Sequence, residues 1–301
     1  MQRAPNLSYT LVQKRLYSLF SQPQKNAIKR GIAFTRRIVV RPRMRPDFLV
    51  IGAQKSGTSS LLEYLVHHGS YLRPLLKDVY FFDRDYRRGL DWYLSFYPSL
   101  AAKKVVESRV GGRVVTGESA THYLLNPWSP ARVRETFPDI KLIVLLRDPV
   151  QRALSHFYHN RRGGVETATS ALDAFLREEE RIGYDARRMQ TDATFYSRSF
   201  ASYSYLARGR YAEQLQRWFK CFPRERILII ESGRFFTDTD AQFRAICRFI
   251  GIAERSLGAY PVAGQGKRRG DDENAITFAR EYFRPHNSDL YGLLGERYEW
   301  Q

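Results

Sequence analysis

Residues 52–60 combine glycine, lysine and hydroxyl side chains in a pattern that suits phosphate binding. The stretch follows the short apolar run Phe48–Ile51 and precedes residues whose apolar spacing predicts a helix. At a strand–loop–helix junction, backbone N–H groups and the helix dipole favour an anion. The candidate ligands in this loop are Lys55, Ser56, Gly57, Thr58, Ser59 and Ser60.

This loop departs from the Walker A pattern, in which a lysine directly follows the second glycine. Here Lys55 precedes Gly57 by two positions, and Thr58 occupies the place of the Walker lysine. The loop therefore predicts phosphate binding with a different chemistry. The alternative is a glycine turn with a purely structural role.

A second candidate phosphate site follows the apolar run Lys141–Leu146. That run predicts a strand ending at Arg147, and Pro149 begins a predicted helix at the position that proline favours. Arg147 then lies at the carboxyl edge of the sheet, where open α/β folds bind ligands. Ser155, about two turns into that helix, offers a hydroxyl group. The alternative is that Arg147 and Asp148 simply pair with each other.

Predicted strands and helices alternate along the chain, which implies a parallel sheet covered by helices on both faces. The strands are expected at 47–51, 114–116, 141–146 and 226–230. Helices are expected at 61–66, 130–137, 149–160, 211–219 and 242–250.

The two phosphate motifs together, in this order, resemble those of sulfotransferases that use 3′-phosphoadenosine 5′-phosphosulfate (PAPS). The carbohydrate branch, which includes the heparan sulfate sulfotransferases, is the more similar one. Segments 77–83, 89–98, 117–124 and 282–300 also resemble that branch. The resemblance covers residues 47–301. It implies the sulfotransferase fold, a P-loop-like parallel β-sheet flanked by helices, with residues 1–46 as a basic N-terminal arm and linker.

The resemblance also implies roles for the phosphate ligands. Lys55 should stabilise charge on the leaving phosphate of the donor, while Gly57, Thr58 and Ser59 hold its 5′-phosphosulfate. Arg147 and Ser155 should hold the 3′-phosphate. The basic stretch that contains Lys267 and Arg268 resembles a late loop that closes over the same phosphate, and a solvated charge run is the alternative.

The general base is expected at Asp78, where the heparan sulfate branch has a glutamate. Aspartate can deprotonate an acceptor hydroxyl if it reaches it, and a pKa raised by desolvation would help. A helix-cap or loop role is the alternative for Asp78, and His122 is a second candidate base. The lysine that the family has after the glutamate of the second strand is replaced here by Ser119.

The sequence leaves three other functions to weigh. A phosphate-loop small-molecule or sugar kinase would need magnesium, with Asp148 imitating a Walker B acid. A metal-dependent glycosyltransferase would use the DxD pattern of Asp83 and Asp85. A nucleic-acid or membrane-surface protein would use the basic arm. Sulfuryl transfer from PAPS should need cations rather than a metal, so no bound metal is expected.

Composition limits the remaining possibilities. The chain has 301 residues and a formal charge of +18, but residues 1–46 hold 11 Lys or Arg and no acidic residue. The other 38 basic residues face 31 acidic ones, a net +7 that makes nucleic acid an unlikely partner. No apolar run reaches the length of a membrane span, and the two cysteines exclude a disulfide framework.

We therefore expect a cytoplasmic protein whose acceptor is a glycan, a glycolipid or a small-molecule hydroxyl compound. Basic and aromatic residues suited to a sugar or an anionic glycan lie in one segment: Arg73, Arg84, Arg87, Arg88, Trp92 and Tyr93. The apolar side chains Leu11, Val12, Leu16, Leu19 and Phe20 fall near one helical face, so the arm could contact a membrane surface. The alternative is an extension that is loosely ordered or packed against the body.

Overall fold

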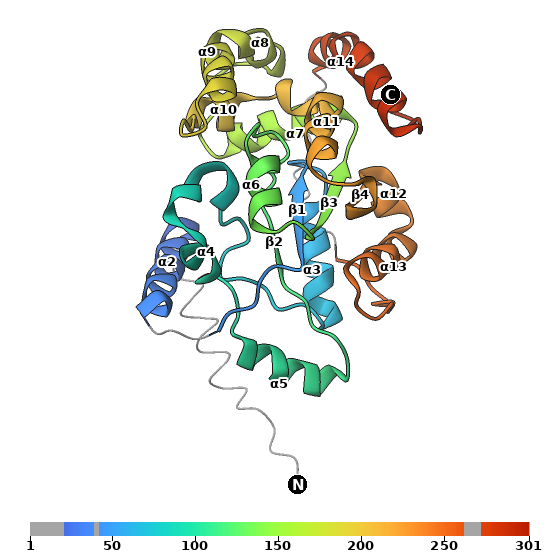
Figure 1. Cartoon of the computed structure of the whole chain (residues 1–301). Coiled ribbons are helices and arrows are strands. Elements are labelled where there is room, and N and C mark those ends of the chain that lie inside the picture. The colour runs from blue at the N-terminus through green and yellow to red at the C-terminus, as the bar shows by residue number, and fades with distance from the viewer. Residues whose placement is uncertain (1–20, 39–41, 262–271, 301) are drawn as a thin grey trace.

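The computed structural model describes residues 21–38, 42–261 and 272–300 (Figure 1). Four parallel strands form a sheet at its centre in the order β2-β1-β3-β4. They are β1 (Phe48–Gly52), β2 (Gly117–Ser119), β3 (Lys141–Leu146) and β4 (Ile227–Glu231). Parallel strands need crossover connections, which helices supply here. The predicted α/β fold with a parallel sheet flanked by helices is confirmed.

Helices surround the sheet on both faces and at its carboxyl edge (Figure 1). The first group is α2 (Gln22–Ile38), α3 (Thr58–His68), α4 (Leu90–Leu94), α5 (Leu100–Val110), α6 (Ser129–Thr136) and α7 (Pro149–Arg162). The second is α8 (Ala171–Leu176), α9 (Glu178–Thr191), α10 (Arg198–Tyr203), α11 (Tyr211–Cys221), α12 (Ser232–Thr237), α13 (Thr239–Ile250) and α14 (Glu273–Leu294). Short helical segments are η1 (Phe81–Asp85), η2 (Tyr86–Arg88), η3 (Ala207–Gly209) and η4 (Arg224–Arg226).

The sheet separates two apolar cores because successive strand side chains point to opposite faces. Leu49 and Ile51 of β1 pack with side chains of α4, α6 and α11. Phe48 and Val50 pack with α3, α12 and α13 on the other side. Both faces of the strand are therefore buried, which explains why its sequence is an uninterrupted apolar run.

The second strand begins later than the sequence predicts. Residues 114–116 were expected to form it, but β2 spans Gly117–Ser119. Val115 instead pairs with Tyr71, and its backbone N–H and C=O bond Ser70 and Leu72. The chain joins β1 only after that local pairing ends.

Part of the basic N-terminal region is attached to the rest of the protein. Helix α2 lies against α4, and its Ala33 is buried in a core cluster (Figure 1). After it, the Met44 amide donates to Pro98 O at 2.9 Å, and the Leu100 amide donates to Pro42 O at 2.9 Å. The amphipathic pattern at 11–20 lies outside the described residues. The division of the chain at residue 46 stays a prediction.

No helix in the described ranges is both long and apolar enough to cross a membrane. Both cysteines are free thiols, with Cys247 on the buried face of α13 and Cys221 partly exposed at the end of α11.

Candidate active site

The loop between β1 and α3 has the backbone shape of an anion-binding turn. Lys55 and Gly57 both adopt positive φ angles, 69° and 97°, and α3 begins at the next residue, Thr58. Left-handed residues in such turns point successive N–H groups to one concave side. A Cβ at position 57 would come within 2.9 Å of the Phe236 ring, so glycine is required for space as well as for conformation. Lys55 pays a conformational cost that is typical of ligand-binding positions.

The hydroxyl groups of this loop differ in their surroundings. Ser56 is buried, and its Oγ has no hydrogen-bond partner within the described residues. Thr58 and Ser60 are also buried, whereas Ser59 is exposed and accepts a hydrogen bond from Lys77 Nζ at 2.9 Å. A buried hydroxyl without a partner is costly, and an anionic oxygen in the turn would supply one. The loop therefore suits an anion such as a phosphate group.

Arg147 contacts this loop. The two candidate phosphate motifs of the sequence therefore lie side by side. Its Nη1 donates to Lys55 O at 3.1 Å, across the adjoining carboxyl ends of β1 and β3. The pKa of Lys55 is lowered, first by burial and then by the positive charges of Arg162, Arg147 and Lys77. Several cations thus face one turn, a concentration of like charge that a polyanion would relieve.

Helix α7 turns one face toward the same loop. Asp148 caps the helix by accepting a hydrogen bond from the Val150 amide at 2.9 Å. Ser155, half-buried, lies four and seven residues before His159 and Arg162, a spacing that places the three on one helical face. Lys55 and Arg162 both lower the pKa of His159, after burial.

His159 and Arg162 were missed in the sequence analysis, although their spacing from Ser155 could have revealed them. Asp148, weighed there as a partner of Arg147 or as a Walker B acid, has the role of helix cap. Lys267 and Arg268 lie outside the described residues, so their contact with the 3′-phosphate stays a prediction.

Asp78 follows Lys77, whose Nζ donates to Ser59 Oγ in the anion-binding turn. Burial raises the pKa of Asp78 to about 6, against the opposing charge of Lys77. A carboxylate with that pKa is ionised at neutral pH and is a stronger base than an ordinary aspartate. Tyr80, two residues later, has a positive φ of 62°, an uncommon conformation that turns the chain into η1.

A buried carboxyl group anchors residues 77–83 to the sheet. These residues carry the candidate base Asp78 and are called the base loop below. Glu118, at the centre of β2, is fully buried and accepts a hydrogen bond from the Val79 amide at 2.7 Å. It also accepts hydrogen bonds from the hydroxyls of Tyr93 at 2.7 Å and Tyr123 at 2.9 Å. The Tyr123 hydroxyl in turn accepts one from the Phe81 amide at 3.0 Å. Both sides of Tyr80 are thereby attached to the sheet.

Burial raises the pKa of Glu118 to about 8, although its three hydrogen-bond donors act in the opposite direction. Sequence spacing could not indicate this cluster, since its members come from three separate segments. Glu118 contacts the base loop rather than the ligand side, so we regard it as a positioning residue.

His122 is less suited to accept a proton. Burial, followed by the charges of Arg208 and Arg84, lowers its pKa well below the usual value. Arg208 Nη2 lies 3.3 Å from both ring nitrogens, and the edge of the ring contacts Tyr80. A histidine held neutral beside a guanidinium is a weak base.

The DxD pattern does not form a site with two converging acids. Asp83 is buried, its carboxyl oxygens have no hydrogen-bond partner in the described part of the chain, and burial raises its pKa to about 7. Asp85 instead pairs with Arg84 at 2.7 Å and Arg88 at 2.8 Å. Residues 21–38, 42–261 and 272–300 contain no cluster of three or more potential metal ligands. The absence of a metal stays a prediction.

The aromatic side chains expected to stack on a sugar are internal. Trp92 and Tyr93 are only 7% and 0% exposed, and both pack in the core cluster beside the sheet. Their proposed contact with the acceptor is wrong in this structure, because the apolar face of α4 turns inward. The nearby arginines Arg73, Arg84, Arg87 and Arg88 are exposed, as expected.

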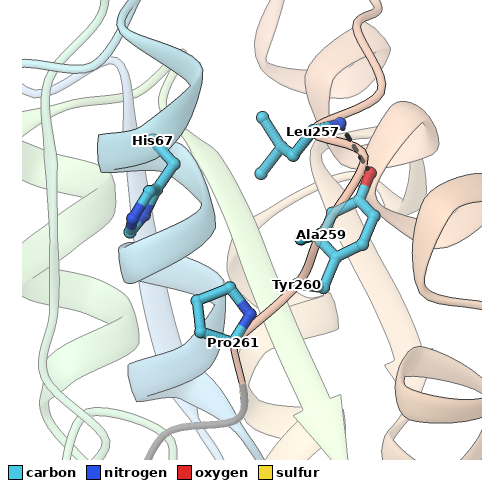
Figure 2. Close-up of a pocket in the computed structure, with 5 residues that line it drawn as sticks. All are labelled: His67, Leu257, Ala259, Tyr260 and Pro261. Carbon is cyan, nitrogen blue, oxygen red and sulfur yellow. Dashed lines mark hydrogen bonds between the residues drawn. The ribbon is translucent and has the colours of Figure 1, made fainter.

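A hollow elsewhere on the surface shares no residue with this site. Figure 2 shows it between His67 and the segment that carries Leu257, Ala259, Tyr260 and Pro261. His67 is in the last turn of α3, whereas the anion-binding turn is at the opposite end of that helix. Its lining lacks the cations and carboxylates of the candidate active site.

The comparisons with known proteins agree with this geometry. A model of the sulfotransferase domain family matches residues 45–259. The chain belongs to this family. Its domain is that of a sulfotransferase, an enzyme class whose donor is PAPS.

Its relatives include enzymes of heparan sulfate. Human heparan sulfate glucosamine 3-O-sulfotransferase 3B1 is 26% identical over 279 residues, which cover 85% of this chain and 65% of that protein. Human bifunctional heparan sulfate N-deacetylase/N-sulfotransferase 3 is 29% identical over 279 residues, covering 83% and 30%. The chain thus spans less than two thirds of the length of these two relatives.

A solved structure supports the fold directly. The crystal structure of a sulfotransferase from Alicyclobacillus acidocaldarius matches with a TM-score of 0.62 and 27% sequence identity. The match covers 85% of this chain and 98% of that one. The resemblance to the PAPS-dependent sulfotransferases and their fold is therefore confirmed.

Proposed function

We propose that this sulfotransferase moves a sulfuryl group from PAPS to a hydroxyl, or an amine, of a carbohydrate-like acceptor by in-line displacement. One observation carries the proposal. Lys77, next to the half-buried Asp78, donates a hydrogen bond to Ser59 in the turn that holds Lys55, and Arg147 donates to the carbonyl of that lysine. This contact supports a base in the segment next to a cationic phosphate cradle.

In this reaction the bond between sulfur and the 5′-phosphate oxygen breaks as the acceptor oxygen bonds to sulfur. Asp78 accepts the proton of the acceptor hydroxyl, and Lys55 stabilises the negative charge that develops on the departing phosphate. The turn at Ser56–Ser59 and the arginine at 147 hold the donor in line with the acceptor. Positioning and charge stabilisation supply most of the catalysis, as in phosphoryl transfer.

The roles in donor binding follow from position. Ser56, Gly57, Thr58, Ser59 and Ser60 would bind the 5′-phosphosulfate. Arg147 and Ser155 would bind the 3′-phosphate, with Arg162 adding charge from the same face of α7. Two phosphate subsites joined by one ribose would make the donor a bisphosphorylated nucleotide.

The acceptor is proposed from two kinds of support. The relatives named above are heparan sulfate enzymes, and four exposed arginines lie near the base loop, which suits an anionic glycan. A glycolipid or a small-molecule hydroxyl compound would use the same base. The family's lysine is absent, and Ser119 in its place is buried, so acceptor contacts must differ from those of the heparan sulfate enzymes.

Isothermal titration with 3′-phosphoadenosine 5′-phosphate (PAP), ADP and ATP tests the donor. We expect PAP to bind at least tenfold more tightly than either adenine nucleotide without magnesium, because only PAP fills both subsites. ATP binding that equals PAP binding and requires Mg²⁺ would instead establish the kinase alternative. Labelled PAPS with a panel of glycans, glycolipids and phenols then identifies the acceptor. The cytoplasmic location stays a prediction.

A further inference from the structure

Helix α2 presents a nearly uncharged face to solvent. Among its exposed residues between Gln22 and Arg37, only Arg37 carries a charge. The apolar side chains of Ile28, Ile32 and Phe34 on that surface are 40%, 41% and 62% exposed. A surface helix of a globular protein normally has the opposite arrangement, with its charged face toward water.

The cations of α2 lie along its flank against the body. Lys29 and Arg30 are half-buried, and the pKa of each is lowered first by burial. The charge of Arg73 acts next on Lys29, and that of Arg84 acts next on Arg30. No acidic residue occurs anywhere in residues 1–46. Exposed apolar side chains are therefore bordered by positive charge, without a negative charge on the helix.

We propose that α2 docks this protein onto the surface of an anionic lipid bilayer. Helices that lie on membranes insert an apolar face and keep Lys and Arg at the level of the headgroups. Here Ile28 and Ile32 lie along one edge of the exposed face and Phe34 lies at the other edge. The flanking cations complement anionic lipid. Nothing in this arrangement requires the helix to span the bilayer.

Charge also argues against a second copy of the chain as the occupant. A two-fold contact through this face would bring the same cations of both copies together without intervening carboxylates from α2. Nucleic acid would satisfy the cations but leave the three apolar side chains against water. An anionic bilayer satisfies both features.

This docking would place the membrane beside the acceptor side of the active site. Helix α2 packs on α4, and Arg30 lies near enough to Arg84 and Arg88 for their charges to affect it. The end of the base loop is thus close to the docking helix. Figure 1 shows α2 and α4 as neighbours. The proposal does not depend on the identity of the acceptor.

Vesicle flotation of the full chain tests the docking surface. Vesicles of phosphatidylcholine alone are compared with vesicles that also contain phosphatidylserine, at low and high salt. We expect at least roughly tenfold stronger binding to the anionic vesicles, weakened by salt. The variant Ile28→Gln/Ile32→Gln/Phe34→Gln should lose roughly tenfold or more of that binding.

A matched control removes equally exposed apolar side chains elsewhere. Leu100, Val105 and Leu176 are 41%, 51% and 60% exposed, and the variant Leu100→Gln/Val105→Gln/Leu176→Gln should bind like the unchanged protein. Circular dichroism and donor binding verify that both variants are folded. Equal binding of the α2 variant and the unchanged protein, or no preference for anionic vesicles, overturns the proposal. A concentration-dependent dimer that only the α2 substitutions dissociate, seen by sedimentation, overturns it as well.

Discussion

The proposed donor side and the proposed acceptor side of this active site are built in different ways. On the donor side, a turn of backbone amides is surrounded by the cations Lys55, Arg147 and Arg162. On the acceptor side, the carboxyl group of Glu118 is fully buried and Asp78 is partly buried, and desolvation raises their pKa values to about 8 and about 6. One side acts through positive charge and the other through desolvated acid groups.

The difference corresponds to the charges that each side must handle. The donor is a polyanion in every state, so permanent cations and helix dipoles suit it. The acceptor hydroxyl is neutral until it loses a proton, which requires a base of matched pKa in a fixed position. Substitutions on the two sides should therefore affect different kinetic constants.

The largest effect should come from the donor side. Lys55→Ala should reduce kcat by roughly 100- to 1000-fold, because the charge on the leaving phosphate loses its nearest cation. Steady-state kinetics with PAPS measures this, and circular dichroism checks the fold. Lys104→Ala, on the exposed face of α5, is the control and should leave kcat unchanged. Full turnover in Lys55→Ala would remove this lysine from the mechanism.

The next effect should come from the acceptor side. Asp78→Asn should reduce kcat by roughly 100-fold with little change in donor affinity, since an amide cannot accept the proton. In the unchanged enzyme the base must be ionised, and its pKa is raised to about 6. Activity should therefore decrease about tenfold per pH unit below that value and level off above it.

The pH profile also separates the two candidate bases. Asp78→Asn should abolish the decrease in activity at low pH. His122→Gln should keep that decrease, because the histidine is held neutral by a depressed pKa. Near-full turnover in the Asp78 variant, together with the loss of the low-pH decrease in the His122 variant, would show that the histidine is the base.

A smaller effect is expected from the residue that positions the base. Glu118→Gln should lower kcat by roughly tenfold while the affinity for PAP stays unchanged, because its carboxyl group accepts the hydrogen bond of the Val79 amide next to the base. Glu225→Gln, at an exposed position in η4, serves as the control. A loss of donor affinity equal to the loss of kcat would indicate a general structural role instead.

The smallest effect should come from the outer cation of the donor side. Arg162→Ala should weaken PAP binding by roughly fivefold, more at low salt, because an exposed guanidinium is screened by solvent. Titration calorimetry at two ionic strengths measures the change, with Arg187→Ala on α9 as the control. Unchanged affinity at low salt would remove Arg162 from the donor site.

Much of the donor side was predictable because its residues are close together in sequence or follow a helical period. Lys55–Ser60 is one continuous loop between a strand and a helix. Arg147 and Ser155 lie on the next strand–helix unit, and the parallel order of β1 and β3 brings the two units together. His159 and Arg162 follow from the same period, although they were overlooked.

The acceptor side was much harder to predict because its contacts join distant segments. Glu118 binds Val79, Tyr93 and Tyr123, which no local spacing connects. For the same reason, the burial of Trp92 and Tyr93 was missed. An aromatic residue in a polar stretch is compatible with either an exposed or a buried side chain. The positions of the neighbouring helices decide between the two.

The sequence alone therefore determined the family, the parallel sheet and the location of the anion-binding turn. These depend on local order, namely apolar strands, a glycine turn and a helix start. Only the tertiary structure decided the raised pKa of Asp78, the lowered pKa of His122 and the face of α2 that is exposed to solvent. Burial and contacts between like charges on separate segments set those properties. Neither can be inferred from the order of residues in the sequence.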